Sequence, residues 1–382
     1  MSRPLKILIT DPHLGGGGQV RYVTNLAREL TRLGQEVSVG CKSGSILAEK
    51  ARQAGCMVLD RFGFQGGVRP RSWLGDLRVT LRYIQEQRPD ILHVNGSADH
   101  WVGAWANQWL GSPVCLLRTR HNTYTVPDHI PNRVLNRRWT DYQIVVCHTV
   151  RETLEQQRAF DPQRMCSIHN GVDAELFRPD PQLRTLARRE FAYTDEHLVC
   201  GIAARLVPAK GHEYLFRAAH QLRSDWPQLR VLVLGEGSLE AELRRLSHEL
   251  GLEDRIHFAG YRHDMHRCVQ AFDIGVQPSI DCDTSSFSLK EQMAEEKPVV
   301  ASDYGGLPEI VADGKEGLVV PAGQVEPLAH AIKQLAASPQ WRAEMGQAGR
   351  RRVLQEFTVQ VFAQKTLEAY HRALEIHAQR WG

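Results

Sequence analysis

Short apolar runs alternate with longer amphipathic segments along the whole chain. The runs have the length of strands buried in a parallel sheet, and the longer segments carry apolar residues at helical spacing. The pattern opens with a predicted strand at residues 6–10, a helix at about 19–33 and a second strand at 36–40. Strands and helices in this order predict an α/β fold built from parallel sheets.

The same two patterns predict elements in both halves of the chain. We expect further strands at residues 91–95, 114–118, 144–147, 198–203, 230–234, 271–276 and 298–301. We expect further helices at about 183–191, 241–250, 325–337, 341–356 and 357–378. No internal repeat of solenoid length is present, so we expect globular domains.

Composition agrees with this class. The chain has 382 residues, which is enough for two or three domains, and it is 42% hydrophobic and 24% charged. No apolar run approaches the roughly 20 residues of a membrane span, and we expect the opening MSRPLKILIT to be a first strand rather than a signal peptide. Eight cysteines without a CxxC pair indicate reduced thiols of a cytoplasmic protein, with neither disulfides nor zinc.

Charge is distributed unevenly. Residues 1–175 contain 22 Lys and Arg against 16 Asp and Glu, whereas the remainder contains 25 against 28. The basic first half hints at an anionic partner. The segment 128–139 (DHIPNRVLNRRW) combines Arg133, Arg137 and Arg138 with apolar residues. It suits an anionic membrane surface or an anionic acceptor, and it equally suits an ordinary basic helix.

The stretch 278–311 concentrates candidate chemistry. It carries a carboxylate at Asp283, then a loop of mostly small residues, and a second carboxylate eight positions on at Glu291. The pattern predicts strand, loop, helix and strand, with backbone N–H groups of the loop and helix start able to hold an anion. The alternative is a capping box from Ser288 to Glu291, in which the glutamate only caps a helix.

Other candidates follow predicted strands. Glycines 15–18 come after the first strand, at the edge where parallel sheets bind ligands, although a flexible surface loop is an alternative. The G-x-G-x-x-G fingerprint and its acidic partner are missing, which argues against a dehydrogenase. Arg205 and Lys210 lie between a strand and a helix, where two cations suit a pyrophosphate. Elsewhere on a surface, such a pair would mean little.

The stretch 278–311 resembles the paired-glutamate signature of family 4 glycosyltransferases, which have the GT-B fold. The resemblance continues through KPVVASDYGGLPEIV and DGKEGLVVPAG, and the IHNGVD at 168–173 is similar to the junction that ends the first domain of these enzymes. The sequence departs from the family at Asp283, where a glutamate is usual. It also departs at Ser285, Ser286 and Ser288, where Phe, Gly and Pro are common.

The resemblance implies two doubly wound, Rossmann-like domains facing a cleft. Residues 1–175 would form an acceptor-binding domain, residues 176–356 a nucleotide-sugar-binding domain, and residues 357–382 a helix that packs back on the first domain. The implied activity is retaining transfer of a hexose from a nucleotide-sugar, with a UDP-sugar preferred, to a hydroxyl group. A lipid-linked acceptor or a cell-envelope glycan such as a polysaccharide or lipopolysaccharide is expected, with contact at the inner face of an anionic membrane and no nucleic acid partner.

The resemblance also assigns residue roles. Arg205 and Lys210 would bind the diphosphate, Glu291 the ribose and Asp283 the donor sugar, with His121 bordering the sugar from the other domain. Further donor contacts are implied for Gly16, Gly17, Tyr261, Arg262, Ser285, Ser286 and Phe287. Three strand-end residues are acceptor-side candidates: His93, Asn95 and Arg120.

No cofactor or metal is expected, because the two cations would carry the charge that a divalent ion carries elsewhere. Asp281-Cys-Asp283 has the spacing of a metal motif but overlaps the paired-carboxylate signature, so we reject it as a metal site. Three alternatives remain open: a nucleotide-sugar 2-epimerase, a non-catalytic nucleotide-sugar-binding homologue, and a dehydrogenase.

Overall fold

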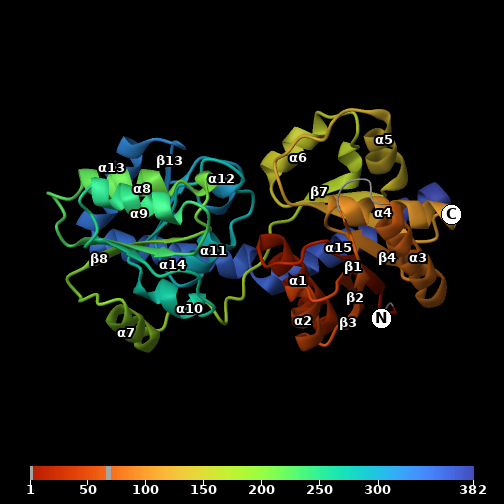
Figure 1. Cartoon of the computed structure of the whole chain (residues 1–382), viewed down its shortest axis with the longest axis horizontal. Coiled ribbons are helices and arrows are strands. Elements are labelled where there is room, and N and C mark those ends of the chain that lie inside the picture. Colours follow the sequence, from red (N-terminus) through yellow and green to blue (C-terminus); the bar gives the residue numbers. More distant parts are fainter. Residues whose placement is uncertain (1–2, 66–69) are drawn as a thin grey trace. The chain divides into compact units, whose positions relative to one another are not determined.

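The computed structural model describes residues 3–65 and 70–382, and the chain folds as two compact units (Figure 1). Residues 1–171 and 359–382 form the first unit, and residues 172–358 form the second. The C-terminal segment thus belongs to the unit that contains the start of the chain. Each unit is a parallel sheet flanked by helices, as the alternation of strand and helix patterns predicts.

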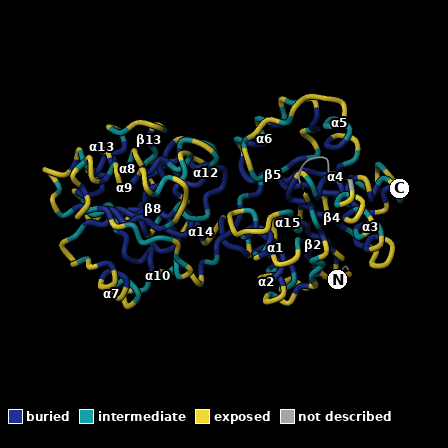
Figure 2. Tube along the Cα trace, in the orientation of Figure 1, coloured by how far each residue is buried: buried dark blue, intermediate teal, exposed yellow. Residues whose placement is uncertain are grey.

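The sheet of the first unit has seven parallel strands in the order β3-β2-β1-β4-β5-β6-β7. Their bounds are β1 Lys6–Thr10, β2 Glu36–Lys42, β3 Met57–Phe62, β4 Ile91–Val94, β5 Cys115–Arg120, β6 Tyr142–Val145 and β7 Met165–Ser167. The central strands β1, β4, β5 and β6 are largely buried, and the outer faces of the surrounding helices are exposed (Figure 2).

The helices of the first unit lie in the connections between these strands. They are α1 Gly18–Arg32, α2 Ile46–Gln53, α3 Pro70–Gln87, α4 Ser97–Trp109, α5 Ile130–Arg133, η1 Val134–Trp139, α6 His148–Glu155, η2 Pro162–Arg164 and, from the end of the chain, α15 Val359–Trp381. Helix α15 packs on α1, where the rings of Tyr22 and Phe362 meet edge to face at 4.7 Å. It also contacts the sheet, because Tyr370 OH forms a hydrogen bond with His93 of β4.

The sheet of the second unit has six parallel strands in the order β10-β9-β8-β11-β12-β13. Their bounds are β8 Leu198–Ala203, β9 Leu229–Leu234, β10 Ile256–Phe258, β11 Ile274–Gln277, β12 Val299–Ser302 and β13 Gly317–Val320. In this sheet the strand order reverses between β8 and β11, as it does between β1 and β4 in the first. Open α/β sheets bind ligands beside such reversal points, at the carboxyl ends of the strands.

The helices of the second unit cover both faces of its sheet. They are α7 Pro181–Glu190, η3 Pro208–Lys210, α8 His212–Gln221, α9 Glu240–Glu249, α10 Met265–Cys268, η4 Val269–Ala271, α11 Phe287–Ala294, α12 Leu307–Ile310, α13 Val325–Ala337 and α14 Pro339–Glu356. Three buried clusters hold them to the sheet. The first includes Phe216, Val231 and Ile332, the second Leu289, Val299 and Val353, and the third Phe191, Val199 and Leu232.

Candidate functional site

The loops that follow β8 and β11 lie side by side at the reversal point of the second sheet. Ile280 N donates to the carbonyl oxygen of Ala209 at 3.0 Å, which joins the two loops. Gly211 has a φ of 66°, and a Cβ at this position would lie 2.0 Å from the carbonyl oxygen of Pro278. Only glycine permits this approach. The two loops therefore form one site at the ligand-binding edge of the sheet.

Lys210 and Asp283 meet at this edge. The Nζ of Lys210 lies 2.8 Å from Oδ2 of Asp283, and both side chains are largely buried. The same oxygen accepts hydrogen bonds from Ser279 Oγ at 2.7 Å and from Gln277 Nε2 at 2.9 Å. Three donors on one oxygen fix the carboxylate, which in turn orients the ammonium group. Lys210, which the resemblance assigns to the diphosphate, and Asp283, which it assigns to the donor sugar, thus lie in direct contact.

Helix α11 begins at Phe287 with Ser286 as its N-cap, and Ser286 Oγ accepts a hydrogen bond from Leu289 N at 3.3 Å. The capping box from Ser288 to Glu291 is therefore not formed. Ser288 Oγ instead accepts from Gln292 Nε2 at 2.8 Å. Glu291 lies one turn inside the helix and is 2% exposed.

The serine loop before α11 is held from within the helix. Lys290 is buried and donates from Nζ to Ser285 Oγ at 2.7 Å, while its ammonium group lies 5.0 Å from the centre of the Phe357 ring. The buried ammonium group of Lys290 thus contacts the serine loop that precedes α11. The dipole of this helix also favours an anion at its start. The sequence does not identify Lys290 as a site residue, because the pattern of neighbouring residues does not show that its side chain is buried.

Arg205 lies two residues beyond the end of β8 and is exposed. Within the described ranges, its side chain has no hydrogen bond or ion pair. The structure thus presents one cation in solvent, Arg205, beside a second cation, Lys210, that is paired with Asp283. An exposed guanidinium with unused donors is well suited to a phosphate oxygen.

The expected nucleobase loop follows β10 and is joined to the neighbouring loop by a hydrogen bond from Gly235 N to the carbonyl oxygen of Gly260, at 2.8 Å. Tyr261 is 60% exposed, so its ring is open to a ligand. Arg262 is different, because it pairs with Asp264 at 2.8 Å and with Glu190 of α7 at 2.9 Å. The guanidinium nitrogens are all engaged by carboxylates, and the expected contact of Arg262 with the donor stays a prediction. Arg262 holds the loop to α7.

At the reversal point of the first sheet, His121 follows β5. Its Nε2 lies 2.9 Å from Asn95 Oδ1, and its ring meets Tyr22 edge to face at 4.7 Å. Asn95 Nδ2 donates to the carbonyl oxygen of Thr10, so Asn95 Oδ1 is the acceptor and His121 carries its proton on Nε2. Burial lowers the pKa of His121 well below 6.5, and the charge of Arg118 lowers it further. His121 is therefore a neutral imidazole with a fixed orientation.

The three acceptor-side candidates are held by contacts within the first unit, and their role in acceptor binding stays a prediction. His93 is fully buried, and its ring nitrogens are bonded to Tyr370 OH at 2.7 Å and Thr119 Oγ1 at 2.6 Å. Burial lowers the pKa of His93 to about 3, so it is neutral and joins α15 to the sheet. Asn95 is buried, with its amide used by Thr10 and His121. Arg120 donates to Asn136 Oδ1 and lies 5.1 Å from the centre of the Phe160 ring.

The glycine loop lies beside this reversal point. Gly16 and Gly17 are both exposed, and Gly17 has a φ of 138° at the start of α1. Ile46 N donates to the carbonyl oxygen of Leu14 at 3.1 Å, which ties the loop to α2. The loop thus presents backbone without side chains at the helix start, in the position that the sequence predicts for phosphate contact.

Two buried carboxylates that the sequence motifs do not mark hold the ends of these strands and loops in place. Asp11 accepts from Gln19 Nε2 at 2.7 Å and from His13 N at 2.8 Å, which folds the glycine loop back on β1. Asp99 accepts from Thr10 Oγ1 at 2.7 Å and from Gly96 N at 2.8 Å, and burial raises its pKa to about 6. The acidic residue three positions after Gly96 was a capping signal that could have identified Asp99.

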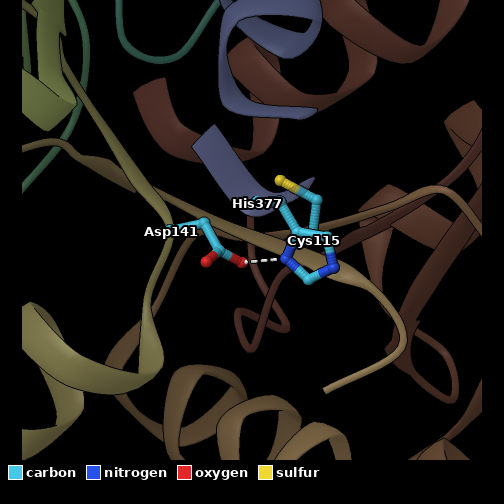
Figure 3. A group of neighbouring side chains, drawn as sticks. All are labelled: Cys115, Asp141 and His377. Carbon is cyan, nitrogen blue, oxygen red and sulfur yellow. Dashed lines mark hydrogen bonds and ion pairs between the residues drawn. The ribbon is translucent and has the colours of Figure 1, made fainter. Parts of the chain in front are cut away.

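Within the part of the chain that the structure describes, one group of three potential metal ligands lies within 4.8 Å: Cys115, Asp141 and His377 (Figure 3). Asp141 already accepts from His377 Nδ1 at 2.9 Å, Arg380 Nη1 at 2.6 Å and Leu116 N at 2.9 Å. Burial raises the pKa of the Cys115 thiol well above 9.0. The carboxylate of Asp141 is thus occupied by donors from α15, and this group anchors the end of α15 to the sheet.

Two family models match the chain, one in each half. The model described as Glycosyltransferase Family 4 matches residues 16–176, and the model described as Glycosyl transferases group 1 matches residues 184–352. No helix among the described residues is long and apolar enough to cross a membrane.

Curated relatives extend the match to most of the chain. The D-inositol 3-phosphate glycosyltransferase of Stackebrandtia nassauensis is 33% identical over 396 residues, which cover 95% of this chain and 88% of the relative. The GDP-mannose-dependent alpha-(1-6)-phosphatidylinositol monomannoside mannosyltransferase of Mycolicibacterium smegmatis is 33% identical over 188 residues, which cover 47% of this chain. The chain spans about half the length of that second relative, 49%.

Solved structures share the fold. A glycosyltransferase of Rickettsia africae ESF-5 superimposes with a TM-score of 0.88 at 21% identity, covering 98% of this chain and 100% of the other. The HepE protein of Anabaena, in complex with UDP, superimposes with a TM-score of 0.84 at 23% identity, covering 96% and 100%. The fold, the two family models and the relative that matches along nearly its whole length agree, and the chain belongs to family 4 of the GT-B glycosyltransferases.

Proposed function

We propose that this protein transfers a hexose from a UDP-sugar to a hydroxyl group, with retention of configuration at the anomeric carbon. One observation carries the proposal. The loops after β8 and β11 bring Arg205 and the Lys210–Asp283 pair to the reversal point of the second sheet, where a parallel sheet binds nucleotides. Family membership supports sugar transfer as the reaction.

The proposed chemistry is electrostatic. Arg205 and Lys210 stabilise the negative charge that grows on the departing diphosphate, and the start of α11, with Lys290 behind it, adds positive potential. Asp283 holds the donor sugar and Glu291 the ribose. Because the two cations and the helix start supply the positive charge at this edge, the proposed reaction uses no metal ion or other cofactor.

The choice of UDP rests on the neighbouring structures, whose HepE complexes contain UDP and UDP-glucose. One relative is instead GDP-mannose-dependent. The donor nucleotide is therefore the first quantity to be measured.

For the acceptor we propose a cell-envelope glycan or a lipid-linked sugar, taken up by the first unit. Its excess of basic residues, 22 against 16 acidic ones in residues 1–175, supports an anionic acceptor at the inner face of the cytoplasmic membrane. His121, held by Asn95 and Tyr22, is the side chain of this unit that we propose to border the reacting sugar.

The test is thermal unfolding of the full chain with UDP-, GDP-, ADP- and dTDP-sugars, followed by turnover with the nucleotide that binds. A ligand that binds the native state raises the melting temperature by mass action. We expect UDP-sugars to give the largest rise, and nucleotide release to require an acceptor. A changed sugar formed without an acceptor would indicate an epimerase, and binding without turnover a non-catalytic homologue. No rise with any nucleotide-sugar at saturating concentration would overturn the proposal.

A further inference from the structure

A surface pocket of about 670 Å³ lies in the first unit, lined by residues of that unit alone. Six of its eleven lining residues are arginines: Arg133, Arg137, Arg138, Arg164, Arg372 and Arg380. We refer to it as the arginine pocket. Its volume lies within the roughly 300–1,000 Å³ of small-molecule sites.

The arginine pocket lies near the amino ends of the strands, whereas His121 and the glycine loop lie at their carboxyl ends. Its walls are α5 and η1, which lead into β6, then η2, which leads into β7, and the last turns of α15. These segments meet where strands begin, whereas His121 and the glycine loop lie where strands end. In a parallel sheet these are opposite edges. The pocket is therefore separate from the edge at which the first unit is proposed to meet a donor or acceptor.

Several of the arginines are held in place by backbone oxygens. Arg164 donates to the carbonyl oxygens of Arg137 at 2.6 Å and Thr140 at 3.2 Å, and Arg380 donates to Thr140 O at 3.0 Å. Arg137 donates to the carbonyl oxygen of Arg158 at 3.2 Å. These bonds orient the guanidinium groups without neutralising them, and each arginine retains unused N–H donors.

The charges of the pocket are not balanced. Four of the arginines pair with carboxylates, namely Asp128, Asp161, Asp141 and Glu375. Arg137 and Arg138 have no carboxylate partner among the described residues. Six guanidinium groups against four carboxylates leave an excess of two positive charges.

Repulsion between the cations affects the pKa of Arg380. Burial lowers the pKa of Arg380 below 12.5, Asp141 offsets part of this effect, and the nearby charge of Arg164 lowers it further. A bound anion would relieve that repulsion. A phosphate monoester carries about 1.5 to 2 negative charges at neutral pH, which matches the excess.

We propose that the arginine pocket binds a phosphate group, in a second anion site separate from the nucleotide site. Guanidinium groups bind phosphate through paired N–H donors, and several of them converge here. The phosphate belongs either to a soluble phosphorylated molecule or to a phospholipid headgroup. Ile130, 73% exposed at the start of α5, the helix that carries Arg133, is suited to contact with the lipid.

The test compares the full chain with Arg138→Gln/Arg372→Gln. Both side chains are exposed and neither donates to a backbone oxygen, so the fold is expected to be retained. The matched control is Arg52→Gln/Arg82→Gln, which removes the same charge from exposed helix positions outside the pocket. Arg205→Gln reports on the nucleotide site. If the pocket variant unfolds, Arg137→Gln/Arg138→Gln replaces it.

One arm measures binding of pyrophosphate and inorganic phosphate by calorimetry at fixed ionic strength. The other measures co-sedimentation with phosphatidylcholine vesicles, with and without phosphatidic acid. We expect saturable binding in at least one arm, weakened about tenfold or more in the pocket variant and unchanged in the control. Pyrophosphate that binds at the nucleotide site is weakened in Arg205→Gln instead, so the two variants separate the two sites. The responding arm identifies the source of the phosphate. No binding in either arm, an equal loss in the control, or a loss confined to Arg205→Gln would overturn the proposal.

Discussion

At the scale of single residues, the site depends on contacts between positions far apart in the chain. Lys210 and Asp283 are separated by 73 positions, yet they form the ion pair at the centre of the candidate site. The sequence indicated each of them separately, because each follows a buried strand in a recognisable motif. It did not indicate Ser279, Gln277 or Lys290, because their roles depend on where their side chains point after folding.

Side-chain direction also decides which strand-end residues are left open to a ligand. His93, Asn95 and Arg120 lie at strand ends, as a ligand-binding residue would, but His93 is bonded to Tyr370, which is 277 positions away. Arg262 forms an ion pair with Glu190 at the end of α7, far from it in the sequence. A strand-end position can be predicted from the sequence, whereas the partner that occupies the side chain cannot.

Glu295, at the C-terminal end of α11, gives a prediction at this scale. It is 1% exposed, and neither carboxylate oxygen has a hydrogen-bond partner among the described residues. Burial raises its pKa to about 9, although the charges of Lys297 and Arg350 act in the opposite direction. Between pH 4.5 and 9 the folded state therefore holds a proton that the unfolded state has lost, and this group makes stability fall as pH rises.

Glu295→Gln removes this effect. We expect the variant to be more stable than the parent at pH 8, by about 1–3 kcal/mol, because the parent must take up a proton at Glu295 when it folds and the glutamine need not. The gain should shrink as pH falls towards 4.5, where both states of the parent are protonated. Denaturant unfolding at several pH values measures it, with the exposed Glu344→Gln as control. A gain that does not vary with pH would contradict the protonated carboxyl.

At the scale of elements, the apolar pattern predicted strand β8 and helix α13 with the bounds that the structure has, 198–203 and 325–337. We predicted that β5 ends at Arg118, because the residues that follow are polar. The strand instead continues to Arg120 and is largely buried. The sequence suggested a capping box that starts at Ser288, whereas α11 begins at Phe287 with Ser286 as its N-cap. Tertiary packing of the loop after β11 selects Ser286.

The connection from β8 to α8 depends on Gly211, where φ is 66° and a Cβ would lie 2.0 Å from Pro278 O. Gly211→Ala must therefore move the loop after β11 as well as strain its own backbone. We expect a loss of about 2–4 kcal/mol in the free energy of unfolding, together with weaker nucleotide binding. Gly251 has a φ of 63° with nothing within 4 Å of a Cβ, so Gly251→Ala isolates the cost of backbone strain alone.

The cost expected for Gly251→Ala is about 1 kcal/mol, with nucleotide binding unchanged. Chemical denaturation of both variants, with calorimetry of the nucleotide, provides the comparison. Equal losses of stability in the two variants would show that the contact with Pro278 does not constrain the site.

At the scale of the whole molecule, the two units share one design. Each has a parallel sheet whose strand order reverses once, and each places its candidate residues at that reversal. The resemblance to family 4 led to this architecture from short motifs, of which the paired carboxylates were the strongest. The return of α15 to the first unit also followed from the resemblance, because nothing in the amphipathic pattern of 357–378 says which sheet the helix packs on.

The central claim is that the loops after β8 and β11 bind the diphosphate of a nucleotide. The most direct measurement is the calorimetric affinity for UDP and for uridine, in the parent chain and in Arg205→Gln. Arg205 is exposed, so its replacement should leave the fold intact, and Arg245→Gln, also exposed in the second unit, is the matched control. We expect Arg205→Gln to weaken UDP binding about tenfold or more and to leave uridine binding unchanged. Equal UDP affinity in the parent and in Arg205→Gln would contradict the account.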